Sequence, residues 1–291
     1  MERVLVLGST GMLGSACLKV FGSDKSFEVF ATSRKPGGQH VSFDAKKSDL
    51  TILFNEYRPN WIINCIGIIK PHINEMSPDS IQNAIKINSQ FPADLAAAAK
   101  KNKSKIIQIA TDCVYSGERG MYTESDLHDA TDVYGKTKSL GEVPSENVMH
   151  LRSSIIGPEV GRATSLLEWF RNQPKNAHIN GFSDHLWNGI TTHHFAKVSL
   201  GIVKSNCFSQ GVHHIIPSNI VTKAHLLNIF SETYNRKDIK INEIISSNHV
   251  DRTLSTNQKE FNLNIWELAG YNSPPTIAEM VNEQASFIQS L

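Results

Sequence analysis

The chain has 291 residues, of which 40% are hydrophobic, with 29 basic and 28 acidic side chains and a net charge of +1. This composition is typical of a soluble globular protein, large enough for one good core or for a core with an appended lobe. It excludes the basic footprint of a nucleic-acid-binding protein, and the longest apolar stretch, around "WIINCIGII", is too short to span a bilayer.

Apolar, strand-like runs alternate with helical patterns along the first half of the chain. The expected strands cover residues 3–8, 28–33, 61–67, 106–112 and 148–154, with helices such as 11–22, 48–59 and 80–102 between them. The strands are continuously apolar, as in a sheet that helices cover on both faces. This order predicts an α/β fold with a doubly wound, Rossmann-like parallel sheet.

The pattern of segments also divides the chain into a sheet and a lobe. We expect the dinucleotide-binding domain within residues 1–157, with a returning segment at about 188–217 that ends in a strand. Residues 158–187 and 218–291 are mostly helical, but too interrupted to form an independent domain. They predict a small, mainly helical C-terminal substrate lobe, packed on the carboxyl ends of the sheet.

The glycine-rich stretch "RVLVLGSTGMLGS" is typical of a turn that binds phosphate. Gly8, Gly11 and Gly14 follow the first strand directly and open a helix. Glycines let the backbone approach a diphosphate, and the helix N-terminus supplies N–H groups and a positive dipole end. Thr10, Met12 and Leu13, which lie between the glycines, belong to the same predicted cofactor site. The alternative is a tight turn whose small residues serve packing only.

The end of the second strand, "ATSRKPGG", predicts which dinucleotide is bound. Where an NAD-binding protein presents a carboxylate to the ribose, this chain has Ser33, Arg34 and Lys35. The cationic pair suits a 2′-phosphate, so NADPH is preferred and NADH is possible; the alternative is two solvated loop charges. Asp44, which closes a further short strand in "VSFDAKKSDL", lies near the adenine in this interpretation or caps the next helix.

Two segments further along predict the reacting groups. Tyr134 and Lys138, at i and i+4 in "DVYGKTKSLGE", share one face of a helix. A free phenol titrates at about pH 10, and a nearby ammonium is expected to lower the pKa of Tyr134. Thr111, at the end of the strand "IIQIAT", offers its hydroxyl to the oxygen that Tyr134 would protonate. Tyr-x-x-x-Lys alone is often only a helix surface, but after a glycine-rich turn it predicts a proton-donating site for a carbonyl.

In these motifs, and in "PNWIINCIG", "INSQFPADLAAAAKKN" and "LRSSIIGPE", the chain resembles the extended short-chain dehydrogenase/reductase family, most closely its dTDP-4-dehydrorhamnose reductase-like branch. The resemblance spans roughly residues 1–160. It implies catalytic roles for Thr111, Tyr134 and Lys138. It also implies that residues 64–67 and 152–156 line the cofactor, and the implied contacts are Cys65, Ile66, Gly67, Ser154 and Ile155.

Asn88 corresponds in this resemblance to a helix asparagine that acts through its main chain. Pro92 lies at i+4 and has no N–H to bond the Asn88 carbonyl. The carbonyl would then be free to hold a water that leads towards Lys138. The alternative is an ordinary proline kink.

The chain departs from its relatives after the strand-end threonine. Sugar-nucleotide dehydratases show Thr-Asp-Glu, whereas this chain reads Thr111-Asp112-Cys113, which disfavours dehydration. Relatives that epimerise and reduce pair such a cysteine with a histidine, and Glu159 stands at that position. Cys113 is therefore interpreted as a small packing residue. Asp112 either orients substrate or caps the following loop.

The expected lobe supplies the remaining candidate substrate contacts. Trp187, Asn188 and Thr191, in "WNGITTHHF", fall where the lobe should meet the sheet. They close the sugar site in this interpretation, or form a buried junction with Thr191 as a helix cap. Arg252, in "DRTLS", contacts a diphosphate or pairs with Asp251 or the surface.

No metal site is predicted. The four cysteines are far apart without a CxxC pair, and adjacent histidines point to different faces of a strand or helix. The absence of a disulfide framework and of a secretory signal pattern favours the cytoplasm.

The resemblance implies NADPH-dependent reduction of the 4-keto group of a nucleotide-activated 6-deoxyhexulose, in the biosynthesis of deoxysugars for surface polysaccharide. The alternatives are a non-catalytic, NADP-binding regulatory subunit and a nucleotide-sugar epimerase or epimerase/reductase. The expected partners are a nucleotide sugar and a second copy of the chain as a homodimer, with no nucleic acid and no membrane.

Overall fold

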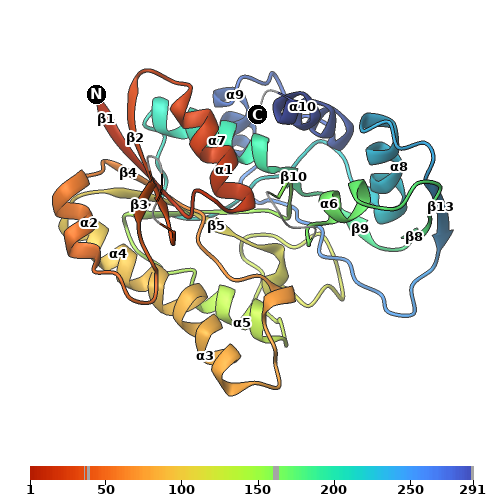
Figure 1. Ribbon diagram of the computed structural model, residues 1–291, viewed down its shortest axis with the longest axis horizontal. Coiled ribbons are helices and arrows are strands. Elements are labelled where there is room, and N and C mark those ends of the chain that lie inside the picture. The colour runs from red at the N-terminus through yellow and green to blue at the C-terminus, as the bar shows by residue number, and fades with distance from the viewer. Residues whose placement is uncertain (36, 38–39, 160–163, 290–291) are drawn as a thin grey trace.

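A seven-stranded parallel sheet forms the centre of the computed structural model, which describes residues 1–291 except 36, 38–39, 160–163 and 290–291 (Figure 1). Every neighbouring pair of its strands runs parallel. The strands in spatial order are β11 (Gly211–His214), β6 (Val148–Arg152), β5 (Lys105–Ala110), β4 (Trp61–Asn64), β1 (Glu2–Leu7), β2 (Phe27–Ser33) and β3 (His40–Ser42). The doubly wound α/β fold predicted from the sequence is confirmed.

The central strands are apolar on both sides because each side faces a layer of helices. In β1, Val4 and Val6 belong to one buried hydrophobic cluster, and Leu5 and Leu7 belong to the other. Successive side chains of a strand point to opposite faces, so this alternation assigns one cluster to each face of the sheet. The continuous apolar runs of the sequence therefore reflect burial on two sides.

Helices flank the sheet in two layers, as Figure 1 shows. The helices are α1 (Met12–Gly22), α2 (Leu50–Tyr57), α3 (Pro78–Ile85), α4 (Phe91–Lys101), α5 (Val133–Leu140), α6 (Leu166–Arg171), α7 (Thr192–Lys204), α8 (Lys223–Thr233), α9 (Lys259–Leu268) and α10 (Ile277–Gln289). The helices α1 and α7 pack together on one face, and α2 and α4 cover the other. The helices α3 and α5 lie beside each other and extend the α4 layer towards the carboxyl ends of the strands.

The second half of the chain contributes both to the sheet layers and to the lobe. The helices α9 and α10 pack against α7. The helices α6 and α8 form the lobe with three pairs of short strands. The pairs are β7 (Ile155–Ile156) with β10 (Ile190–Thr191), β9 (Leu186–Trp187) with β12 (Val221–Thr222), and β8 (His178–Phe182) with β13 (Lys240–Ile244). The sequence analysis missed β8 and β13, which add a two-stranded sheet to the helical lobe.

Arg152, at the carboxyl end of β6, is buried in a polar network. Its guanidinium donates to the Tyr115 hydroxyl at 2.6 Å, lies 3.0 Å from His214 Nε2 and pairs with the Glu142 carboxylate. Burial and the Arg152 charge lower the pKa of His214 to about 4. His214 Nδ1 faces the Ser255 carbonyl oxygen at 2.6 Å, so the proton of the neutral ring lies on Nδ1 and Nε2 accepts from Arg152. The network ties β6 to the segments before β6 and after β11.

Replacing Glu142 with Leu is expected to lower the free energy of unfolding by about 3–5 kcal/mol, because it leaves the buried Arg152 charge without its carboxylate. The double variant Glu142→Leu/Arg152→Met should recover most of this loss. Glu232→Leu breaks an exposed ion pair to Lys237 and should cost about 1 kcal/mol or less. Urea unfolding at pH 7 measures all three; equal losses for Glu142→Leu and Glu232→Leu would contradict the assignment.

Candidate functional site

The turn between β1 and α1 has the backbone geometry of an anion seat. Gly8 has a φ of +75°, and the Gly11 amide donates to the Gly8 carbonyl at 3.0 Å. A Cβ on Gly14 would collide with the same carbonyl, so only glycine allows the helix to approach the turn this closely. Gly11 offers no side-chain cap to α1, and the first turn of α1 contains no acidic residue. The amide groups and positive dipole end of α1 therefore suit a diphosphate.

Side chains of β2 hold this turn in place. Thr32 accepts a hydrogen bond from the Gly8 amide at its hydroxyl (3.2 Å) and from the Ser9 hydroxyl at its carbonyl (2.8 Å). Thr10 is exposed on the turn, whereas Leu13 is buried in the core beneath it. Of the predicted cofactor residues, Thr10 thus belongs to the exposed surface of the turn, whereas Leu13 supports the turn from the core.

The end of β2 presents two cations, Arg34 and Lys35, whose side chains are both exposed. Arg34 is exposed, while the buried Ser33 hydroxyl donates to the Lys35 carbonyl at 2.6 Å. The Asp44 carboxylate accepts from the Lys46 amide at 2.9 Å, so it caps its own turn. Arg34 and Lys35 are therefore the side chains of this group that are open to a 2′-phosphate.

The loop after β4 borders the glycine turn. Ile66 packs on Gly8: a Cβ added to Gly8 would lie 2.9 Å from Ile66 Cγ1. The Cys65 thiol lies 3.8 Å from the thiol of Cys17 in α1, and Gly67 is exposed. The structure thus brings these three predicted cofactor residues to the same place as the turn.

Asn88 lies in a π-helical turn, Lys86–Gln90, which joins α3 to α4. Its side-chain amide accepts from the Ile68 amide at 2.9 Å and donates to the Ile68 carbonyl at 3.0 Å and to the Thr137 hydroxyl at 3.2 Å. Its carbonyl packs against Gly141, where a Cβ would collide with it. The sequence predicted a main-chain role, whereas these contacts make the side chain a clamp between the β4 loop and α5.

The three predicted reacting side chains meet at the carboxyl end of β5. Thr111 follows β5 directly, and its side chain interacts with that of Tyr134 in α5. Lys138, one turn along α5, donates from Nζ to the Ile109 carbonyl at 3.2 Å. The Asp132 side chain caps α5 by accepting from the Gly135 amide at 2.7 Å, which fixes the start of the helix.

Burial dominates the protonation of this group. It raises the pKa of Tyr134 well above its ordinary value and lowers the pKa of Lys138. The expectation that Lys138 lowers the pKa of Tyr134 is therefore wrong, because loss of hydration disfavours the charged phenolate and the neighbouring acidic groups act in the same direction. Tyr134 consequently keeps its proton at neutral pH, the form that a proton donor needs.

Ser154 and Ile155 connect the sheet to the lobe. The Ser154 hydroxyl accepts from the Trp187 indole at 2.9 Å, and its carbonyl accepts from the Ile190 amide at 2.9 Å. Ile155 pairs with Ile190 in the short β7–β10 ladder. These contacts fix the ring of Trp187, a predicted substrate residue, beside the carboxyl end of β6.

Asp112 and Cys113 form a buried corner next to Thr111. Burial raises the pKa of Asp112 above its ordinary value and raises the pKa of Cys113 to about 12. Cys113 is therefore a neutral thiol, which agrees with its interpretation as a packing residue rather than a base. Arg252 lies within electrostatic reach of both, and its Nε donates to the Tyr115 carbonyl at 2.8 Å.

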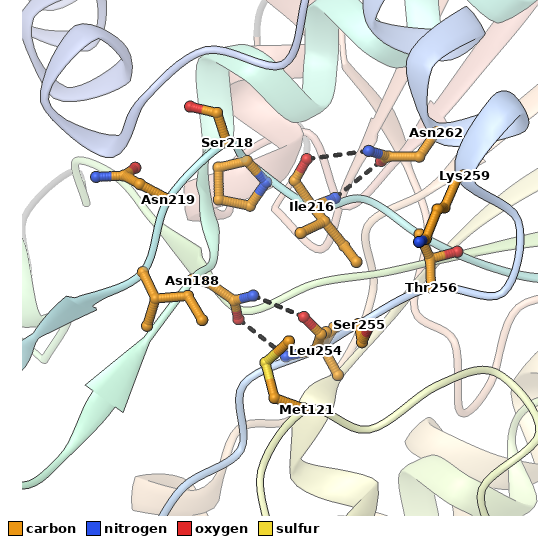
Figure 2. A pocket seen from close by; sticks show the side chains of 12 residues that line it. Met121, Asn188, Ile216, Ser218, Asn219, Leu254, Ser255, Thr256, Lys259 and Asn262 are labelled. Carbon is orange, nitrogen blue, oxygen red and sulfur yellow. Dashed lines mark hydrogen bonds between the residues drawn. The ribbon is translucent and has the colours of Figure 1, made fainter.

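The side chains of Asn188 and Thr191, two other predicted substrate residues, form hydrogen bonds within the protein. Asn188 exchanges two hydrogen bonds with the Leu254 backbone, at 2.7 and 2.9 Å, as Figure 2 shows. Thr191 caps α7 by accepting from the His194 amide at 3.3 Å. Asn188 also lines a cavity of about 270 Å³ between residues 216–220 and 254–256, whose lining does not include the Thr111–Tyr134 group. The buried-junction alternative therefore describes these two residues.

Lys223, the first residue of α8, is a site residue that was not predicted from the sequence. Its ammonium lies 5.5 Å from the centre of the Trp187 ring and interacts electrostatically with Asp112 and Cys113. Burial lowers the pKa of Lys223 to about 8. A positive charge is unfavourable at the N-terminus of a helix because of the helix dipole. The lysine in "VTKAH" is such a charge, and this unusual placement could have marked Lys223 as a functional residue from the sequence.

The described residues contain no group of three or more His, Cys, Asp or Glu side chains arranged to hold a metal ion. None of their helices is both long and apolar enough to cross a membrane.

Comparison with known proteins gives a family and a set of relatives. The family model described as "RmlD substrate binding domain" matches residues 1–286. Methionine adenosyltransferase 2 subunit beta from Rattus norvegicus is 30% identical over 142 residues, which cover 48% of this chain and 42% of that protein. dTDP-4-dehydrorhamnose reductase from Aggregatibacter actinomycetemcomitans is 29% identical over 144 residues, 49% of this chain and 46% of that protein. Each match spans less than half the length of these relatives.

Among solved structures, dTDP-4-dehydrorhamnose reductase from Bacillus anthracis in complex with NADP has a TM-score of 0.78 and 17% identity, and the match covers 100% of both chains. At this level of identity the likeness shows a shared fold.

Gly14→Ala is expected to raise the Kd for NADPH by about tenfold or more, because the added methyl displaces the Gly8 carbonyl and with it the anion seat. Gly22→Ala, on the same helix with nothing within 4 Å of an added Cβ, should bind like the parent chain. Fluorescence titration with NADPH measures both. Unchanged affinity in Gly14→Ala, with the fold intact, would contradict the seat.

Proposed function

Because the chain belongs to the RmlD substrate binding domain family, we propose that it is an NADPH-preferring reductase of the 4-keto group of a nucleotide-activated 6-deoxyhexulose. The observation that carries the proposal is the meeting of Thr111, Tyr134 and Lys138 at the carboxyl end of β5. The Asn88 clamp links this group to the loop that packs on the glycine turn. The carboxyl ends of β1 and β5 thus bring together an anion seat and a proton donor.

Each residue of the group has a distinct role in the proposed reduction. NADPH, when bound, supplies the hydride. The Tyr134 phenol carries its proton at neutral pH and donates it to the carbonyl oxygen of the sugar as that oxygen gains charge. Thr111, beside Tyr134, hydrogen-bonds the same developing alkoxide. Lys138, held on the Ile109 carbonyl, contributes positive charge beside the phenolate that forms and orients the cofactor ribose.

The preference for NADPH is supported by the end of β2. Arg34 is exposed there, whereas the neighbouring carboxylate of Asp44 is occupied by its own loop. A guanidinium binds a phosphate through two parallel hydrogen bonds, and an NAD-specific protein offers a carboxylate instead. The Bacillus anthracis protein of the same fold is in complex with NADP.

A second candidate is a non-catalytic, NADP-binding subunit. It is favoured by the 30% identity to a protein named as the beta subunit of methionine adenosyltransferase 2. A subunit of that kind has no need of a protonated phenol, a lysine and a threonine in one place, so the reductase is preferred. An epimerase/reductase is disfavoured, because Cys113 stays protonated. The cytoplasmic location and the homodimer expected from the sequence remain predictions.

Tyr134→Phe is expected to lower the rate of NADPH oxidation with 4-keto nucleotide sugars by about 10²- to 10⁴-fold, because it removes the proton donor. Its affinity for NADPH should stay the same. Tyr57→Phe removes an exposed hydroxyl that bonds Glu56, and it should retain the full rate. Equal rates for Tyr134→Phe and the parent chain would contradict the mechanism. Tight NADPH binding without turnover of any 4-keto sugar would favour the subunit.

Arg34→Ser is expected to lower kcat/KM with NADPH by about tenfold or more and to leave kcat/KM with NADH unchanged, because the serine lacks the charge that pairs with the 2′-phosphate. Lys25→Ser, at an exposed position before β2, is the control for loss of one positive charge. Steady-state kinetics with both cofactors measures the ratio. Better use of NADH than NADPH by the parent chain would refute the preference.

A further inference from the structure

Lys223 reaches the site on a rigid support that combines a strand and a helix. β12 pairs antiparallel with β9, with Val221 opposite Trp187, and the Lys223 amide donates to the His185 carbonyl at 2.8 Å. Thr222 caps α8 by accepting from the His225 amide at 3.0 Å. The lobe therefore delivers this lysine to a fixed point facing the end of β5.

The Lys223 ammonium and the Asp112 carboxylate attract each other without touching. Each acts on the other electrostatically, yet no ion pair or hydrogen bond joins them within the described part of the chain. Asp112 accepts hydrogen bonds from the Thr111 hydroxyl at 3.2 Å and the Cys113 thiol at 3.6 Å. The Lys223 ammonium forms no hydrogen bond to any described residue and lies over the Trp187 ring. A half-buried ammonium in this position is suited to a ligand.

The chemistry of the two groups restricts what can bind between them. An ammonium only donates hydrogen bonds, and a carboxylate only accepts them. A group that satisfies both must accept from one and donate to the other, as a hydroxyl does. A diphosphate has no proton to give, and the Asp112 charge would repel it. Asp112 also adjoins Thr111, so the hydroxyl belongs to the part of the substrate nearest the reacting carbonyl.

We propose that Lys223 and Asp112 form a specificity pair that recognises a hydroxyl of the sugar ring, so that the lobe selects the sugar rather than the nucleotide. This inference rests on the proposed function, since it takes the substrate to be a nucleotide sugar. Lys223 donates to the hydroxyl oxygen, and the hydroxyl proton is donated to Asp112. The indole ring of Trp187, held by Ser154, forms the adjacent wall.

The test compares affinity for a nucleotide sugar with affinity for the nucleotide alone, in the presence of NADP⁺. The probes are UDP-glucose and dTDP-glucose against UDP and dTDP, measured by isothermal titration calorimetry. In the parent chain, the sugar should improve the Kd for at least one nucleotide. Lys223→Met and Asp112→Asn should each lose about 10- to 100-fold in affinity for that nucleotide sugar. Their affinity for UDP and dTDP should stay within twofold of the parent chain.

Two control variants keep the test specific. Lys237→Met makes the same substitution at an exposed lysine that pairs with Glu232, and it should bind like the parent chain. Lys223→Gln keeps a donor and should retain part of the sugar contribution. Thermal unfolding verifies that each variant is folded.

Three outcomes would overturn the pair. Lys223→Met could lose as much affinity for UDP or dTDP as for the nucleotide sugar, or it could keep the full gain in affinity that the sugar gives. The third outcome is a parent chain that binds the nucleotide sugars no more tightly than the nucleotides alone. None of these measurements uses turnover. A failure of the reductase proposal, seen as absent NADPH oxidation, is therefore distinguishable from a failure of the specificity pair.

Discussion

Parallel pairing of β1, β4 and β5 brings the glycine turn, the Cys65 loop and Thr111 to one edge of the sheet. Leu7 lies opposite Asn64, and Asn64 lies opposite Gln108, so the three strands reach the same level together. The Asn64 side chain donates to Gln108 at 2.6 Å and locks this register. The glycine turn, the Cys65 loop and Thr111 leave the sheet within a few residues of that level. A slip of one strand would separate them, because the side chains would exchange faces.

Loss of hydration is the common cause of the protonation states in this site. It raises the pKa of Tyr134, Asp112 and Cys113, and it lowers the pKa of Lys138 and Lys223. Each shift favours the neutral form. Tyr134, the acid of the site, therefore keeps its proton because it is buried, and no chain of charged groups is needed to hold the proton there.

The fold could be predicted because its signals are local. Runs such as Val4–Leu7 are apolar on both faces, and Gly8 and Gly14 of the first turn have a geometric requirement that no other residue meets. The strand β13 was missed because its side chains are mostly exposed and resemble a loop.

The site was harder to predict because its assignments depend on distant partners. The side-chain amide of Asn188 forms its hydrogen bonds with the backbone of Leu254, 66 positions away, and nothing in the segment around Asn188 indicates this. Lys223 enters the site through a two-residue strand pairing with β9, which is too short to leave a periodic pattern. The Asn88 side chain finds Ile68 and Thr137 only after the β4 loop and α5 have docked.

The cover of the sheet by α7 has a consequence for the order of events during biosynthesis. Val4 and Val6 are sealed from water on the face where α1 and α7 pack together. Residues 192–204, which form α7, leave the ribosome after β1 to β6, six of the seven strands of the sheet. A nascent chain that stops before this helix exposes an apolar sheet face, and its nucleotide-binding half stays incomplete until the second half arrives.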